Sequence, residues 1–243
     1  EALANTEPIM QKLLTYRFTE GSLAGQSFGN LILAALNGVT GSFEEAVSQM
    51  SQVLAITGQV IPVTSANVQL EAVFENGVRV VGESKIYHVK KEQDCRIAHV
   101  ALIPEHPAPL PAALAAIREA DLILLGPGSL YTSVIPNLLV DGVAQAIAQS
   151  DAPKIYVCNI MTQEGESEGY TAADHLEALL AHGCPGLVDL CLANSTPMQP
   201  GLVEKYQAEG AAPLVIDRER IAALGLELVE RPVAAHHGDF ARH

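Results

Sequence analysis

Residues 120–129 form the stretch ADLILLGPGS, and this stretch decides the fold class. The unbroken apolar run at 122–125 is typical of a strand buried on both faces, as strands of parallel sheets are. A turn with two glycines and a proline follows at once, and hydroxyl side chains come directly after it. We therefore expect a buried strand over residues 121–126 that ends in a loop at the edge of a sheet.

A regular alternation of strand and helix patterns continues along the second half of the chain. Apolar runs that predict strands alternate with segments of helical pattern. The strands are expected at KIYVCN (154–159), LVDLCLAN (187–194) and AAPLVID (211–217), and the helices at 111–120, 137–150, 171–183 and 218–225. Short apolar strands alternating with helices indicate parallel βαβ units. The prediction is an α/β fold: a three-layer, doubly wound, mostly parallel Rossmann-like sheet.

The first third of the chain has a different pattern. We expect a buried helix from residues 29–36, GNLILAAL, and a second helix in 42–54, with Ser42 as N-cap and Glu45 at the capping-box spacing. Further on, apolar residues alternate with polar ones on both sides of Asn76–Gly77, a common hairpin dipeptide.

This alternation predicts an antiparallel hairpin of residues 67–74 and 78–86. The hairpin would belong to an insertion at 57–88 in an otherwise single domain, 1–243.

Composition limits the classes of function. The chain has 243 residues, 49% hydrophobic and 17% charged, which excludes a disordered protein, and its net charge of −14 argues against nucleic-acid binding. No apolar run approaches the roughly 20 residues of a membrane span. Residues 1–10 lack a signal-peptide pattern and an initiator Met, so we expect a piece of a longer chain. The four cysteines have no CxxC spacing, which favours reduced thiols in a cytoplasmic protein.

Three loops are expected to share the edge of the sheet where ligands of α/β proteins bind. They are residues 126–133, 159–167 (which includes Thr162) and 194–200. In the first loop Gly126 and Gly128 would let the backbone approach an anion. The hydroxyl donors would come from Ser129, Thr132 and Ser133. The alternative is that the glycines turn the chain and the hydroxyls cap the next helix.

Asn159 and Asn194 each close one of the predicted strands. An amide in this position can read a base, a ribose or a sugar hydroxyl, or it can stabilise the following turn. Each asparagine alone fits the turn, whereas three polar loops at one edge favour a binding cleft.

Motifs of other chemistries are absent from the sequence. It contains no GxGxxG, no GxxxxGK[ST] and no GxSxG. His175 and His182 have no ligand-like partners and predict a solvated helix face. The alternating Glu164, Glu166 and Glu168 predict solvated charge. We therefore expect neither a metal site nor a catalytic residue.

The motifs resemble one known family over essentially the whole chain. Residues 124–140, LLGPGSLYTSVIPNLLV, and 154–179, KIYVCNIMTQEGESEGYTAADHLEAL, resemble the YvcK-like (gluconeogenesis factor) family, within the superfamily of CofD-type phospholactate transferases. Segments GNLILAAL, GSFEEAV, VIPVTSANVQL, VVGESKI, KYQAEGAAPLVID and FARH match in order. The family opens with a Gly-rich loop and a DDGGSSGRLR-type segment, so we expect that this chain begins after them.

The resemblance implies a cytoplasmic regulator that binds a UDP-sugar such as UDP-N-acetylglucosamine. Its role would concern cell shape, cell-wall precursor supply and gluconeogenic growth. The resemblance also implies that Tyr206 stacks on the uracil and that Arg242 binds the diphosphate. The alternatives are a half-buried tyrosine that closes a helix and a charge in a disordered tail. The resemblance also implies that Asn30, Thr64 and Asn67 lie on the substrate side of the cleft.

The alternative function is a nucleotide-dependent transferase of the phospholactate type. Those enzymes work with a divalent metal and carry paired aspartates after the threonine that matches Thr64, where this chain has Ser65, Ala66 and Asn67. Without these carboxylates a magnesium ion has no support, so the regulator is favoured. A homo-oligomer and the identity of protein partners are left open.

Overall fold

The computed structural model describes residues 8–237 and 240–242, and the chain forms two compact units, residues 1–65 and 66–243. The first unit is helical. Its described elements are α1 (Pro8–Thr15), the 3-10 helix η1 (Gly21–Leu23), α2 (Phe28–Thr40) and α3 (Phe43–Val53).

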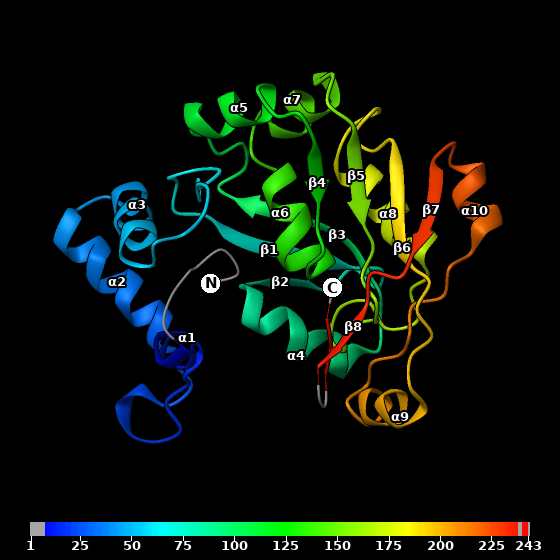
Figure 1. Cartoon of the computed structure of the whole chain (residues 1–243), viewed down its shortest axis with the longest axis horizontal. Helices are drawn as coiled ribbons and strands as arrows, with labels where there is room; N and C mark the ends of the chain where they lie inside the picture. The colour runs from blue at the N-terminus through cyan, green and yellow to red at the C-terminus, as the bar shows by residue number, and fades with distance from the viewer. Residues whose placement is uncertain (1–7, 238–239, 243) are drawn as a thin grey trace. The chain divides into compact units, whose positions relative to one another are not determined.

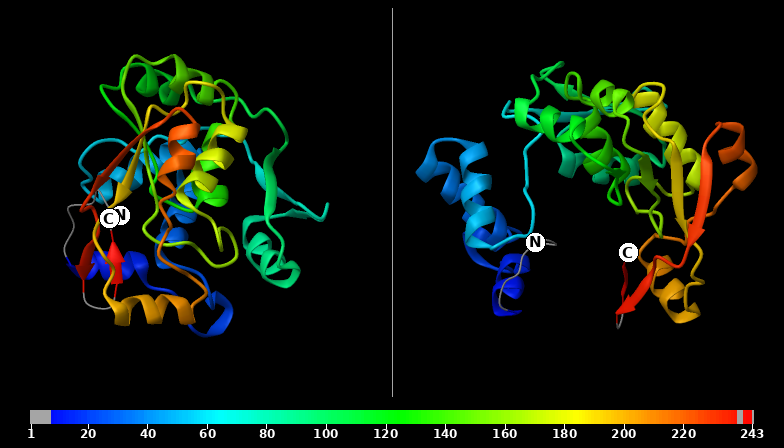
Figure 2. Two further views of the ribbon diagram at one scale, coloured as in Figure 1. Left: turned by 90° about the vertical axis from the view of Figure 1, so that its right-hand side faces the viewer. Right: turned by 45° about the horizontal axis from the view of Figure 1, so that its top comes forward.

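Helices α2 and α3 lie side by side in this unit (Figure 2). Both begin at serine caps: the hydroxyl of Ser27 accepts the N–H of Asn30, and the hydroxyl of Ser42 accepts the N–H of Glu45. The predicted N-cap of α3 is thereby confirmed. The prediction that α2 is a buried helix is wrong, because none of its residues is fully buried. Helix α2 contacts α1 and α3 within this unit, and these contacts leave each of its residues at least partly exposed.

The second unit contains a parallel sheet, an antiparallel sheet and their helices. Its elements are β1 (Gln69–Phe74), β2 (Arg79–Val81), α4 (Glu83–Gln93), β3 (Ile97–Ile103), α5 (Pro111–Arg118), β4 (Ile123–Leu125), the π-helix η2 (Leu130–Val134), α6 (Ile135–Leu138), α7 (Val143–Gln149), β5 (Lys154–Val157), α8 (Ala172–His182), β6 (Leu190–Asn194), α9 (Pro200–Ala208), α10 (Arg218–Ala223), β7 (Glu227–Arg231), β8 (Ala235–His237) and β9 (Phe240–Arg242).

The parallel sheet has the order β4-β5-β6-β7, and its register aligns Leu124 with Ile155 and Ile155 with Leu190. Figure 1 shows the four strands side by side, with α9 beyond their carboxyl ends. Tyr156 and Cys191 are almost fully buried in the core of this unit. The α/β class and the parallel sheet predicted from the sequence are confirmed.

One predicted strand is wrong. Residues 211–217, AAPLVID, form only isolated bridges at Pro213 and Val215, and β7 supplies the fourth strand instead. Pro213 has no N–H to extend a ladder, and Val215 is 60% exposed, so this segment runs over the surface between α9 and α10. We call residues 211–217 the connector.

The hairpin forms around Asn76–Gly77 as predicted, and it is part of a three-stranded antiparallel sheet of order β2-β1-β3. Gly77 has φ +84°, and its N–H donates to the carbonyl of Phe74 at 2.8 Å. The second strand is shorter than expected. It ends at Val81 because Gly82, with φ +107°, turns the chain into α4, which lies against β1 and β2 (Figure 2).

No helix in the described part of the chain combines the length and the apolar character that crossing a membrane requires.

Candidate functional site

The loops that follow β4 and β5 contact each other directly. Asn159 lies just after β5, and its side chain bonds Gly128 twice. Its Nδ2 donates to the Gly128 carbonyl at 2.9 Å, and its Oδ1 accepts the Gly128 N–H at 3.1 Å. The Gly128 N–H, expected to approach a phosphate, therefore already has a partner within the chain.

The two glycines of the first loop (residues 126–133) have different roles. Gly126 has φ +78°, and a Cβ there would lie 3.0 Å from the carbonyl oxygen of Val157. At Gly128 a Cβ would meet only ordinary contacts, 3.6 Å from Val134 and 3.7 Å from Ser133. The position that requires glycine for the backbone itself is Gly126.

A buried carboxylate occupies the start of η2. Glu166, 2% exposed, accepts three backbone hydrogen bonds: from Leu130 at 3.1 Å to Oε2, and from Tyr131 and Thr132 at 2.9 Å each to Oε1. Burial raises the pKa of Glu166, while hydrogen bonds from the side chain and N–H of Thr132 and from the other two N–H groups oppose the rise. These three backbone donors lie in the loop that was expected to bind a ligand phosphate, and they bind a carboxylate of the protein itself.

The sequence did not reveal that the glutamates after β5 make structural contacts within the protein. The prediction of solvated charge is wrong for Glu166, which is buried, whereas Glu164 and Glu168 are partly exposed and held in ion pairs. Glu164 accepts the hydroxyl of Tyr87 at 2.6 Å, and its carboxylate pairs with Lys91 at 2.8 Å.

Glu168 pairs with Lys90, which is only 5% exposed, at 3.1 Å. The carboxylates of Glu164 and Glu168 therefore bind α4, whereas that of Glu166 binds the loop 126–133. Three glutamates in alternate positions look the same in sequence, so nothing in their spacing identifies the buried one.

The predicted hydroxyl donors are partly engaged as well. Ser129 Oγ donates to Gln163 Oε1 at 2.7 Å. Ser133 is exposed, and its carbonyl accepts the side chain of Asn137 at 2.6 Å. A ligand contact by Ser133 stays a prediction.

Thr162 and Asn194 support neighbouring segments. Thr162 exchanges two hydrogen bonds with Ala212 of the connector, through its N–H at 2.8 Å and its Oγ1 at 2.9 Å. Asn194 Oδ1 accepts the N–H of Thr196 at 3.0 Å and of Ala234 at 3.1 Å, and its Nδ2 donates to the Thr196 carbonyl at 2.9 Å. Asn194 therefore stabilises the turn after β6, one of the two roles that the sequence left open.

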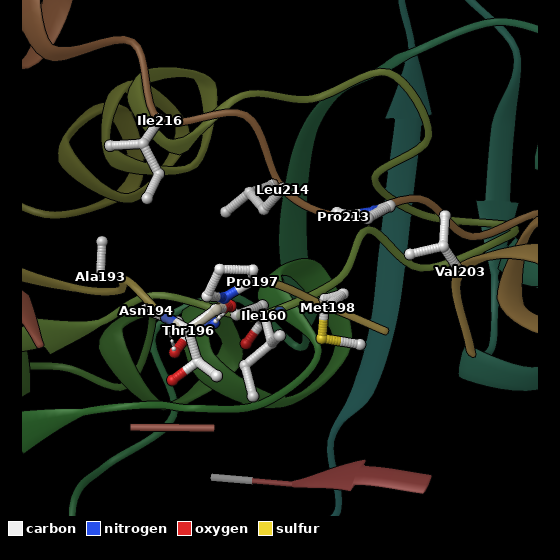
Figure 3. A pocket seen from close by; sticks show the side chains of 11 residues that line it. Ile160, Ala193, Asn194, Thr196, Pro197, Met198, Val203, Pro213, Leu214 and Ile216 are labelled. Carbon is white, nitrogen blue, oxygen red and sulfur yellow. Dashed lines mark hydrogen bonds between the residues drawn. The ribbon is translucent and has the colours of Figure 1, made fainter. Parts of the chain in front are cut away.

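A pocket of about 260 Å³ lies beyond the carboxyl ends of β5 and β6. Figure 3 shows the connector side chains Leu214 and Ile216 on one side and Thr196 and Pro197 on the other. The lining residues are Asn159, Ile160, Ala193, Asn194, Thr196, Pro197, Met198, Val203, Pro213, Leu214 and Ile216. This lining is mostly apolar and includes no lysine or arginine.

One polar atom beside this pocket is unsatisfied. Thr196 Oγ1 is buried and has no hydrogen-bond partner within the described part of the chain. Such a group costs about 1–3 kcal/mol relative to a satisfied one. A ligand hydroxyl or carbonyl could remove that cost.

Tyr206 is half-buried on α9, one helical turn beyond the pocket residue Val203. Arg242 lies in β9, but its side chain is outside the described part of the structure. Asn67 is exposed just before β1. Asn30 and Thr64 belong to the first unit, where Asn30 lies in the first turn of α2 and lines a separate pocket of about 250 Å³. Ligand contacts by all five residues stay predictions.

The two histidines of α8 do not form a solvated face, contrary to the sequence prediction. His175 is fully buried, and its Nδ1 lies 2.9 Å from the Thr171 carbonyl. His182 Nε2 accepts the N–H of Val100 at 3.0 Å, which joins α8 to β3. Across the described residues no three His, Cys, Asp or Glu side chains gather as metal ligands.

Comparisons with known proteins agree over nearly the whole chain. The sequence profile of the family described as 2-phospho-L-lactate transferase CofD matches residues 1–234. A protein named Gluconeogenesis factor from Bacillus subtilis (strain 168) is 46% identical over 244 residues, which cover 100% of this chain and 75% of the relative. Another of that name, from Halalkalibacterium halodurans, is 43% identical over 243 residues and is covered to 74%.

The fold has a close counterpart among solved structures. A crystal structure of a member of the UPF0052 family from Bacillus halodurans superposes with a TM-score of 0.92 at 42% identity. The match covers 100% of this chain and 77% of that chain. The likeness to these proteins therefore extends to both sequence and fold.

Proposed function

This chain belongs to the family described as 2-phospho-L-lactate transferase CofD, and from that membership and the pocket beyond β5 and β6 we propose that it is a regulatory protein that binds a UDP-sugar of the UDP-N-acetylglucosamine type. Two similar proteins carry the name Gluconeogenesis factor. We accordingly place its role in the cytoplasm, in gluconeogenic growth, cell-wall precursor supply and cell shape.

The pocket is the observation that carries this proposal. Its volume of about 260 Å³ is slightly below the roughly 300–1,000 Å³ typical of pockets that enclose a whole drug-sized ligand. A uracil ring or one sugar ring fits such a space, and the remainder of a nucleotide sugar would lie outside. The apolar walls suit a ring, and the lining residue Thr196 has a buried hydroxyl that lacks a partner among the described residues.

The diphosphate would lie away from the backbone of η2. The N–H groups of Leu130, Tyr131 and Thr132 are bonded to Glu166, and that of Gly128 to Asn159. Arg242 keeps its expected role as the cation that binds the diphosphate, because the pocket lining offers no cation.

A transferase is the second candidate, and the description of the family favours it. A transferase of this type uses a divalent metal, which needs free carboxylates. Glu164, Glu166 and Glu168 are each bonded within the protein, and residues 64–67 supply no carboxylate. These residues therefore offer no free carboxylate to a magnesium ion, which favours binding over transfer.

Calorimetry of the intact protein tests the proposal. UDP-N-acetylglucosamine should bind with and without magnesium, and UDP alone should bind more weakly because it lacks the sugar. After prolonged incubation the ligand should be recovered intact. Release of UDP in the presence of an acceptor would establish the transferase instead, and an absence of binding heat at several temperatures would reject the ligand class.

A further inference from the structure

We propose that Glu166 is a positioning residue for the pocket: its carboxylate fixes the loop 126–133 and, through that loop, the side chain of Asn159. This inference rests on the proposed function, because the pocket is taken as the ligand site. Glu166 is not among the residues that line the pocket, so it would act without touching the ligand.

The carboxylate is suited to hold a backbone in one conformation. Leu130, Tyr131 and Thr132 are consecutive, and all three N–H groups converge on the two oxygens of Glu166. Among the described residues, no lysine or arginine forms an ion pair with Glu166. A buried carboxylate needs its charge satisfied, and here the backbone donors do this. The loop and the carboxylate therefore depend on each other.

A continuous set of contacts leads from Glu166 to the pocket. Leu130 follows Ser129, whose hydroxyl is bonded to Gln163 of the same loop as Glu166. Gly128 precedes Ser129 and holds the amide of Asn159 by two hydrogen bonds. Asn159 lines the pocket beside Ile160. If the backbone at 128–132 shifts, Asn159 loses its fixed partner.

The chain offers a matched control in the same loop. Glu164 lies two residues away, but its carboxylate contacts Tyr87 and Lys91 of α4 instead of η2. Glu164→Gln makes the same chemical change as Glu166→Gln without removing an acceptor from the loop 126–133.

The experiment combines amide hydrogen exchange with calorimetry on the intact protein. In the wild type, exchange at Leu130, Tyr131 and Thr132 should be slow without ligand. Glu166→Gln keeps one acceptor and turns the other into a donor that faces N–H groups. Exchange in residues 128–132 should then accelerate about tenfold, and the affinity for UDP-N-acetylglucosamine should fall by a similar factor, the size of one hydrogen bond to a charged group. Glu164→Gln should change neither quantity.

Asn159→Ala combined with Glu166→Gln tests the route. If Glu166 acts through Asn159, the double variant should bind no more weakly than Asn159→Ala alone. Additive losses would overturn that route. Unchanged exchange or unchanged affinity in a folded Glu166→Gln protein would overturn the positioning role.

The experiment still gives an answer if Glu166→Gln does not fold or if the wild type does not bind the ligand. Fast exchange at residues 130–132 in folded wild type would reject the inference even if Glu166→Gln does not fold. If wild type does not bind UDP-N-acetylglucosamine, the proposed function fails, while exchange in the two glutamine variants still decides whether Glu166 holds the loop.

Discussion

Asn159 bonds both the N–H and the carbonyl of Gly128, at 3.1 and 2.9 Å, and so extends the pairing of β4 and β5 into the loops that follow them. A side-chain amide has a donor and an acceptor side by side, which matches the N–H and carbonyl of one residue in an extended backbone. The loop after β4 is therefore set before any ligand arrives.

Asn159→Ala should lower the free energy of unfolding by about 1–3 kcal/mol, because it leaves the partly buried N–H and carbonyl of Gly128 without partners. Urea denaturation measures the change. Asn137→Ala is the control, since its single bond to the Ser133 carbonyl is exposed and should matter little. Equal effects of the two substitutions would show that the bonds to Gly128 are not special.

Gly126→Ala should destabilise the protein more than Gly128→Ala. At Gly126 the positive φ and the 3.0 Å approach to the Val157 carbonyl both oppose a Cβ, whereas at Gly128 the neighbours are at ordinary distances. We expect a loss above about 1 kcal/mol for Gly126→Ala and a smaller change for Gly128→Ala. Thermal unfolding of both variants decides the order, and the reverse order would contradict the conformation of this turn.

The free energy of unfolding should depend on pH through the protonation of Glu166. Burial raises the pKa of this carboxyl above its ordinary range, so the folded state binds its proton more tightly than the unfolded state does. The contribution of Glu166 to stability is therefore fully present below the ordinary pKa of glutamate, about 4.3, and is lost as pH rises through the raised value.

The measurement is urea unfolding of wild type and Glu166→Gln from about pH 4 to 7, where other carboxyls cancel in the difference. Wild-type stability relative to Glu166→Gln should decline as pH rises. The phenols near Glu166, Tyr131 and Tyr156, stay neutral because burial raises the pKa of both. A difference that is constant with pH would mean that the pKa of Glu166 is not raised.

The sequence predicts the parts of the fold that depend on local pattern. The apolar runs before Gly126 and Asn159 form the strands β4 and β5, and Asn76–Gly77 is the expected turn. The prediction that the run 122–125 is buried on both faces is wrong, because β4 lies at the edge of the described parallel sheet and Leu124 is 55% exposed. Strand β7 was missed because it is at the edge of the sheet, and its sequence ELVER places charged residues at both exposed ends. Helix α4 was missed because the predicted hairpin strand was extended through Gly82 to residue 86, whereas Gly82, with φ +107°, ends the strand and turns the chain into the helix.

The edge of the sheet where the site lies was predictable, whereas the partners of its polar groups were not. Glu166 is 34 to 36 residues away in sequence from the N–H groups that it accepts. Local pattern cannot choose between a ligand phosphate and a distant side chain as the anion at η2, because both satisfy the same donors.

Tyr206→Ala should weaken the binding of UDP and of UDP-N-acetylglucosamine by the same factor, since stacking on uracil does not involve the sugar. Stacking contributes about 1–3 kcal/mol per base. Tyr206→Phe keeps the ring and should bind nearly as the wild type does. Calorimetry with both ligands checks this, and a loss confined to the sugar-bearing ligand would place the sugar against Tyr206.

Thr196→Val separates ligand binding from stability most sharply. The substitution replaces a buried hydroxyl that has no partner among the described residues with a methyl group of similar size. Because an unsatisfied polar group is costly to bury, stability should stay the same or rise. If the hydroxyl meets the ligand, affinity for UDP-N-acetylglucosamine should nevertheless fall, and Thr196→Ser should retain most of it. Urea unfolding and calorimetry on the same preparations give both numbers. A Thr196→Val protein that binds as tightly as the wild type would show that the ligand does not use the hydroxyl beside this pocket, and the nucleotide sugar would have to be sought elsewhere on the edge formed by β4, β5 and β6.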